Sequence, residues 1–145
     1  MMQKDNRMIA FVCTGNTCRS PMAEAIFNDM AEKNGICVRA ESFGIATSTG
    51  LPVSENSVIA CKEIGIDLSG KASTAVADAG IEKYEKFYCM SQSHAKMLMQ
   101  FFLVQPEKIA VLGISDPYGG DIEVYRHYRD EIVNSVKEIL KAYEN

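Results

Sequence analysis

The chain is predicted to fold as a single α/β domain, with a four-stranded parallel sheet and helices on both faces. Short apolar runs alternate along its 145 residues with longer segments of helical periodicity, as in parallel strands joined by crossover helices. The length is that of one domain with a substantial core. No repeat, linker or low-complexity segment divides the sequence. We therefore expect one domain over residues 1–145.

Four compact apolar segments have the character of buried strands. They are residues 8–12, 37–43, 86–90 and 108–112. Each is short and rich in aliphatic or aromatic side chains, which favours strand over helix. In open α/β sheets, ligands bind beyond the carboxyl ends of such strands, so the loops that follow them are where chemistry is expected.

The first two helices follow the first two strands. One is expected from Pro21 to Lys33, where apolar residues recur at helical spacing and an Asn-Gly pair follows. Ser54 is a suitable N-cap for the next helix, which should extend to Ile64. Residues 67–83 are rich in small and polar side chains and suggest only a short helix near 77–82.

Two further helices are expected in the second half of the chain. One begins at Ser91 or Ser93 and should bury four apolar side chains: Ala95, Leu98, Phe101 and Phe102. The last is capped by Asp121. It has apolar residues at helical spacing over about five turns: Tyr125, Tyr128, Ile132, Val136, Ile139, Leu140 and Tyr143.

Between the first strand and the first helix lies the polar octet Cys-Thr-Gly-Asn-Thr-Cys-Arg-Ser, residues 13–20. A strand, a short loop and a helix start form an anion cradle, because backbone N–H groups point inward and the helix N-terminus is partly positive. Arg19 can bind two phosphate oxygens with its planar guanidinium. The same positive potential favours the thiolate form of Cys13. Ser20 can cap the helix and hydrogen-bond that thiolate.

Cys-x5-Arg-Ser is the signature of cysteine-dependent phosphatases. The longer string over residues 12–24, together with Asp-Pro-Tyr-Gly-Gly at residues 116–120, closely resembles the low-molecular-weight protein-tyrosine-phosphatase family. The resemblance covers nearly the whole chain. It implies four parallel strands in the order 2-1-3-4, which brings the loops after the first and last strands together. It also implies a metal-independent protein phosphatase that uses no cofactor and acts through a cysteinyl-phosphate.

Three residues are expected to be catalytic. Cys13 attacks phosphorus, Arg19 orients the phosphoryl group and stabilises its equatorial oxygens, and Asp116 protonates the leaving group and then activates water. A lone cysteine is more often a core residue, and Asp-Pro more often a turn. Their occurrence together in this pattern favours catalysis.

The loop and the late tyrosine are expected to bind substrate. This set is Thr14, Gly15, Asn16, Thr17, Cys18, Ser20 and Tyr118. Gly15 and Asn16 both tolerate left-handed backbone, which a tight cradle needs. Tyr118 is expected to form the wall against the leaving group.

A hydrogen-bond network behind the loop is implied by the family resemblance. In relatives the residue matching Asn16 bonds to the hydroxyl matching Ser20, to a serine on the second strand and to a histidine of an H-x-A-R pattern. Ser42 is the candidate strand serine. The chain has Gly-Lys-Ala-Ser at residues 70–73 instead of H-x-A-R, so the outer part of the network must differ.

Five cysteines, an odd number without the density of a secreted scaffold, favour a reducing compartment. In relatives a cysteine placed like Cys18 can form a reversible disulfide with the nucleophile, here Cys13; the alternative is a small residue that packs the loop. Cys37, Cys61 and Cys89 are expected in the core.

Charge and composition limit the partners. A net charge of −4 gives no basic surface suited to nucleic acid, and no apolar run approaches the ~20 residues that span a bilayer. The first seven residues are polar and have no signal-peptide pattern. His94 and His127 lie in different segments, which argues against a metal centre, and His94 should cap its helix or pack locally at the helix start. We expect a cytoplasmic enzyme whose partners are phosphorylated proteins, with a weak homodimer left open.

Thr17 bears on the substrate. Tyrosine-specific relatives generally carry a bulkier aliphatic residue at this position, whereas bacterial protein-arginine phosphatases of the family carry an octet identical to residues 13–20. A small polar side chain leaves room and hydrogen bonding near the phosphorus for a guanidinium, while an aliphatic one narrows the slot around a phenyl ring. The sequence therefore favours phosphoarginine, with phosphotyrosine as the alternative.

Two other function classes stay open. A thiol-coupled arsenate reductase would share the fold and the loop, but it needs a relay of two further cysteines, and only Cys89 follows Cys61. A non-catalytic phosphopeptide-binding module is the second alternative. The intact set of Cys13, Arg19 and Asp116 argues against it.

Overall fold

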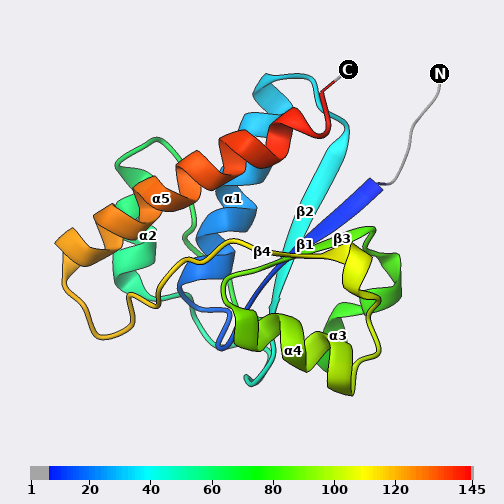
Figure 1. The fold of residues 1–145 in the computed structure, drawn as a ribbon. Coiled ribbons are helices and arrows are strands. Elements are labelled where there is room, and N and C mark those ends of the chain that lie inside the picture. The colour runs from blue at the N-terminus through cyan, green and yellow to red at the C-terminus, as the bar shows by residue number, and fades with distance from the viewer. Residues whose placement is uncertain (1–6, 145) are drawn as a thin grey trace.

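The fold is a single four-stranded parallel sheet flanked by helices, and the computed structural model describes it over residues 7–144 (Figure 1). The polar segment 1–6 therefore lies outside the described residues. The strand order is β2-β1-β3-β4, as predicted, and all neighbouring strands pair in parallel. The strands are β1 (Arg7–Cys13), β2 (Val38–Gly44), β3 (Lys86–Cys89) and β4 (Ile109–Val111).

Strand β1 lies inside the sheet, and after Arg7 it is apolar because both of its faces are covered. Ile9 and Phe11 belong to the core cluster formed with α1, α2 and α5. Ala10 and Val12 belong to a second cluster formed with α3 and α4. The strand thus ends at Cys13 in the middle of the sheet's carboxyl edge, opposite Gly44 of β2.

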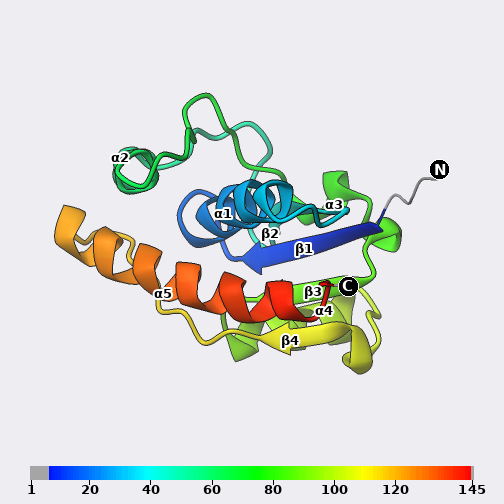
Figure 2. The ribbon, with the colours of Figure 1, turned by 90° about the horizontal axis from the view of Figure 1, so that it is seen from above.

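Three helices cover one face and two the other. Helices α1 (Arg19–Lys33), α2 (Glu55–Lys62) and α5 (Ile122–Lys141) share the first core cluster. The long helix α5 runs beside α1 and α2 (Figures 1 and 2). Helices α3 (Val76–Ala79) and α4 (Gln92–Phe101) cover the other face, and short 3₁₀ turns occur at Ile81–Lys83 and Pro106–Lys108.

The predicted caps of two helices are confirmed. Ser54 Oγ accepts a hydrogen bond from the backbone N–H of Ser57 at the start of α2. Asp121 does the same for Val124 at the start of α5. Within residues 7–144, none of the helices is both long and apolar enough to cross a membrane.

Two predictions about burial are wrong. Phe101 is 66% exposed, because the inward face of α4 passes from Leu98 to Phe102 and leaves Phe101 on the outer side. Cys37 is exposed, because β2 begins only at Val38. The short helix expected near residues 77–82 is divided into α3 and a 3₁₀ turn.

Candidate active site

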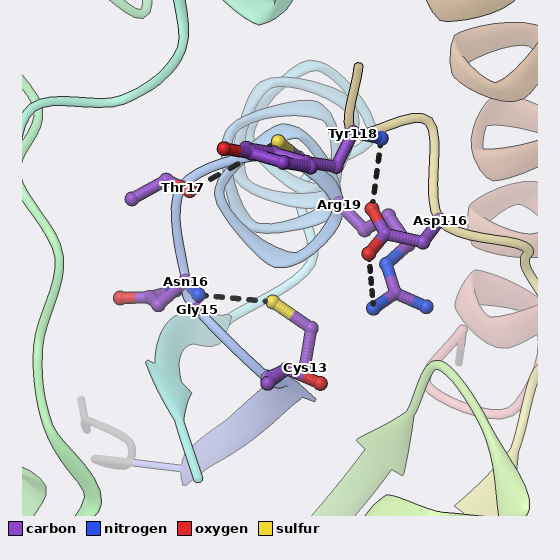
Figure 3. A pocket seen from close by; sticks show the side chains of 9 residues that line it. Cys13, Gly15, Asn16, Thr17, Arg19, Asp116 and Tyr118 are labelled. Carbon is purple, nitrogen blue, oxygen red and sulfur yellow. Dashed lines mark hydrogen bonds and ion pairs between the residues drawn. The ribbon is translucent and has the colours of Figure 1, made fainter. Parts of the chain in front are cut away.

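The loop between β1 and α1 encloses a cavity of about 200 Å³ at the carboxyl edge of the sheet (Figure 3). Its lining combines this loop with two residues from the segment after β4: Cys13, Thr14, Gly15, Asn16, Thr17, Cys18, Arg19, Asp116 and Tyr118. Every residue predicted to be catalytic therefore lies at one cavity. Ser20, the one predicted site residue outside this lining, lies directly behind it.

The sulfur of Cys13 is buried and has two hydrogen-bond partners. The backbone N–H of Asn16 donates to it at 3.2 Å, and the hydroxyl of Ser20 lies 2.8 Å away. Ser20 is not the helix cap that the sequence suggested, because α1 begins at Arg19 and its N-cap position is Cys18. The hydroxyl of Ser20 is instead turned toward the sulfur.

The side chain of Asn16 fixes the direction of these hydrogen bonds. Its Oδ1 accepts from the backbone N–H of Thr74 at 2.7 Å. Its Nδ2 therefore donates to Ser20 Oγ at 2.7 Å and to Ser42 Oγ at 2.9 Å. Because Ser20 Oγ accepts from Asn16, its own hydrogen is left to donate to Cys13. The sulfur of Cys13 thus accepts from both the Ser20 hydroxyl and the Asn16 N–H.

The outer end of the network is an ion pair. Ser42 Oγ donates to one carboxylate oxygen of Glu24 at 2.6 Å, and Lys71 Nζ binds the other oxygen at 2.9 Å. Lys71 comes from the Gly-Lys-Ala-Ser segment that departs from the family pattern. Since a carboxylate can only accept, Glu24 obliges Ser42 to donate outward and to accept from Asn16.

One backbone expectation is confirmed and another is wrong. Asn16 has φ of 55°, in the left-handed region, but Gly15 does not. A Cβ at Gly15 would meet only Thr17 Oγ1, at 3.6 Å. The glycine that the loop needs is Gly44, where a Cβ would lie 2.7 Å from the carbonyl oxygen of Thr14. A glycine at the end of a strand is a common pattern, so the sequence alone did not distinguish Gly44 from the other glycines.

Arg19 and Asp116 lie side by side at one side of the cavity (Figure 3). Arg19 is 7% exposed; its Nη1 donates to the carbonyl of Ile114 at 3.0 Å, and its Nη2 lies 3.8 Å from Asp116 Oδ2. The other oxygen of Asp116 accepts from the backbone N–H of Tyr118 at 2.9 Å. Asp116 is 54% exposed, so its carboxylate is held over the opening and remains accessible to a substrate.

Thr17 and Tyr118 line the cavity on the side away from Cys13 (Figure 3). Tyr118 is 80% exposed, as a wall residue at the mouth would be. Cys18 is buried beside them, with its sulfur 3.4 Å from Tyr125 Oη. Both Cys13 and Cys18 are free thiols, and a disulfide between them stays a prediction.

Cys61 and Cys89 are core residues, as predicted. Both are fully buried, and burial raises the pKa of each thiol to about 12. These thiols are therefore protonated at neutral pH and unsuited to thiol exchange.

His94 contacts the loop, which the sequence did not indicate. It lies in the first turn of α4, and its Nε2 is 2.9 Å from Thr14 Oγ1. Its Nδ1 accepts from the backbone N–H of Ser91, the N-cap. Burial and, to a smaller extent, the charge of Arg19 lower the pKa of His94 to about 4, while Asp116 acts in the opposite direction.

This lowered pKa predicts a pH-dependent stability. Below about pH 6.5 an unfolded chain protonates His94, whereas the folded chain resists protonation until about pH 4. The unfolded chain therefore binds more protons than the folded chain between these two pH values. As a result, the contribution of His94 to the free energy of unfolding is complete above about pH 6.5 and is lost as the pH falls toward 4, by about 3 kcal/mol at most. Urea unfolding at pH 7 and pH 4.5 should show a larger drop for the wild type than for His94→Asn. Equal drops would contradict the assignment.

Comparison with known proteins gives consistent similarities. The sequence model of the family described as "Low molecular weight phosphotyrosine protein phosphatase" matches residues 8–145. A protein-arginine-phosphatase of Bacillus subtilis is 32% identical over 142 residues, which cover 92% of this chain and 94% of the relative.

Two solved structures superpose closely. One is a cysteine-to-serine mutant of the arginine phosphatase YwlE with a phosphorylated active-site serine: its TM-score is 0.88 at 31% identity, over 93% of this chain and 94% of that chain. The other is a low molecular weight protein tyrosine phosphatase from T. tengcongensis: its TM-score is 0.89 at 32% identity, over 94% and 99% of the two chains.

Proposed function

Because the chain belongs to the low molecular weight phosphotyrosine protein phosphatase family, we propose that it hydrolyses phosphorylated protein side chains through Cys13 and that phosphoarginine is its preferred substrate. The observation that carries the proposal is the arrangement of Cys13, Arg19 and Asp116 around one cavity, with Thr17 on its wall. The phosphatase activity is common to the family, and the residue roles and substrate preference are our proposal.

In the first step the Cys13 thiolate attacks phosphorus. The bond between phosphorus and the substrate nitrogen or oxygen breaks, and a sulfur–phosphorus bond forms. Arg19 and the loop N–H groups stabilise the charge on the equatorial oxygens. Asp116, in its protonated form, gives its proton to the leaving atom. The products of this step are the free side chain and a cysteinyl-phosphate.

In the second step water displaces the cysteine. The Asp116 carboxylate takes a proton from a water molecule, whose oxygen attacks phosphorus. The sulfur–phosphorus bond breaks, inorganic phosphate leaves, and the thiolate of Cys13 is restored. The hydroxyl of Ser20, held as a donor by Asn16, stabilises that thiolate as a leaving group. No redox partner is needed for this cycle.

Thr17 supports phosphoarginine over phosphotyrosine. A guanidinium group carries N–H donors next to its phosphorus, whereas a phenyl ring carries none. The cavity offers acceptors for such donors in the hydroxyl of Thr17 and the carboxylate of Asp116, which both line it. The relatives named as arginine phosphatases are consistent with this preference.

A side-by-side assay tests the preference. Peptides that differ only in phosphoarginine or phosphotyrosine are hydrolysed by the wild type and by Thr17→Ile, with Cys13→Ser as the blank. We expect the wild type to prefer phosphoarginine, and Thr17→Ile to lower kcat/KM for that peptide roughly 10- to 100-fold, because a hydrogen bond is lost and the slot narrows. The phosphotyrosine peptide should be hydrolysed at least as well as by the wild type.

Thr17→Val is the matched control, since it removes the hydroxyl at nearly constant volume. A loss with valine as large as with isoleucine assigns the effect to the hydroxyl, and a loss with isoleucine alone assigns it to width. A wild type that prefers phosphotyrosine would overturn the phosphoarginine proposal and leave the phosphatase function intact.

The buried cysteines disfavour an arsenate reductase. A thiol relay needs accessible, ionisable thiols after the nucleophile, and the thiols of Cys61 and Cys89 are buried with raised pKa values. Consumption of reduced thioredoxin that depends on arsenate would be required to support that alternative.

A further inference from the structure

Thr14 is one of the residues that line the cavity, it is exposed, and its hydroxyl is hydrogen-bonded by a residue from another element. Thr14 directly follows the proposed nucleophile Cys13. His94 belongs to α4, which covers the face of the sheet opposite to α1. Their side chains meet at 2.9 Å. Within the described residues, His94 is the hydrogen-bond partner recorded for this hydroxyl.

The direction of this bond follows from the other nitrogen of the ring. Nδ1 lies 3.1 Å from the backbone nitrogen of Ser91, whose N–H can only donate, and 3.0 Å from Ser91 Oγ, whose hydroxyl can donate or accept. Nδ1 must therefore be unprotonated, and the single ring hydrogen is on Nε2. Nε2 donates to Thr14 Oγ1. The hydrogen of the threonine hydroxyl is consequently left free for an acceptor.

The imidazole of His94 keeps this tautomer near neutral pH. His94 is 4% exposed, and the positive charge of Arg19 opposes a second proton. A doubly protonated ring would place two N–H groups against each other at Ser91. The donor to Thr14 is therefore permanent rather than switched near neutral pH.

We propose that His94 is a positioning residue which holds the Thr14 hydroxyl as a hydrogen-bond donor to an oxygen of the bound phosphoryl group. This inference rests on the proposed function. Thr14 lines the same cavity as Cys13 and Arg19. An anion in it would meet this hydroxyl together with the guanidinium of Arg19. The backbone of Thr14 is held separately, since its carbonyl accepts from the N–H of Ala46 at 3.0 Å.

Binding of inorganic phosphate, measured by calorimetry, tests the proposal without relying on turnover. Thr14→Val should weaken phosphate binding about tenfold, the effect of losing one hydrogen bond to a charged group. Thr14→Ser should bind within about twofold of the wild type, because it keeps the hydroxyl. The same pattern should appear in the KM of a phosphorylated peptide.

A second variant separates positioning from helix capping. In His94→Asn the shorter amide oxygen can still accept from the N–H of Ser91 but cannot reach Thr14. It should weaken phosphate binding several-fold. The double variant with Thr14→Val should bind no more weakly than Thr14→Val alone, since both remove one shared interaction.

Two results would overturn the inference. One is an unchanged affinity for phosphate in Thr14→Val. The other is a double variant whose loss of phosphate affinity equals the product of the losses in the two single variants. A wild type that binds phosphate but hydrolyses no phosphorylated peptide would contradict the proposed function instead. The two failures are therefore distinguishable.

Discussion

Replacing Cys13 with serine should abolish turnover of every phosphorylated substrate, with a fall in kcat of about 10⁴-fold or more. A serine hydroxyl is not ionised at neutral pH and is a much weaker nucleophile than a cysteine thiolate. The Asn16 N–H and Arg19 remain, so the cavity should still bind inorganic phosphate. Steady-state hydrolysis and calorimetry measure the two properties separately.

Cys37→Ser is the control for this experiment. Cys37 is exposed and lies before β2, away from the loop, so its replacement should leave kcat unchanged. If Cys13→Ser kept activity within tenfold of the wild type, the assignment of the nucleophile would be wrong.

Replacing Asp116 with asparagine should lower kcat by roughly 10²- to 10⁴-fold on substrates with poor leaving groups, because the amide cannot donate or accept the transferred proton. Asparagine Oδ1 can still accept from the N–H of Tyr118, so the loop geometry should persist. On an aryl phosphate with an acidic phenol the loss should be much smaller, because that leaving group needs no proton. The measurement is kcat over a series of aryl phosphates.

Asp121→Asn serves as the comparison for Asp116→Asn. Asp121 caps α5 through its side chain, and asparagine is an equally good cap, so kcat should hardly change. A loss of the same size for all leaving groups in Asp116→Asn would argue that Asp116 orients the site and does not transfer the proton.

The fold could be predicted for the elements whose burial leaves a regular pattern of apolar residues in the sequence. Strand β1 and helix α5 are such elements, since β1 is apolar after Arg7 and α5 has apolar residues at helical spacing along its length. Phe101 was placed wrongly because positions i+3 and i+4 from Leu98 both fit an inward stripe, and only the packed structure selects Phe102. Cys37 was misplaced by a strand boundary one residue too early.

The site also has residues that could be predicted from the sequence and residues that could not. That Cys13, Arg19 and Asp116 meet at one cavity could be predicted, because the spacing of Cys13 and Arg19 is that of a strand–loop–helix cradle and the strand order brings the loop of Asp116 to it. The partners behind the loop could not, because Glu24, Lys71 and the His94–Thr14 contact depend on how distant segments meet after folding. Neither a glutamate within a helix nor a lysine in a polar loop has a distinctive sequence pattern.

The hydrogen bond from Arg19 to the carbonyl of Ile114 has a consequence for biosynthesis. The ribosome makes Cys13 and Arg19 well before the carbonyl that holds the arginine, which lies 95 residues further along the chain, and before Asp116 beside it. Domains complete their folding as units, so a nascent chain carries the thiol without a finished site. The proposed site is therefore incomplete until the segment after β4 has been made.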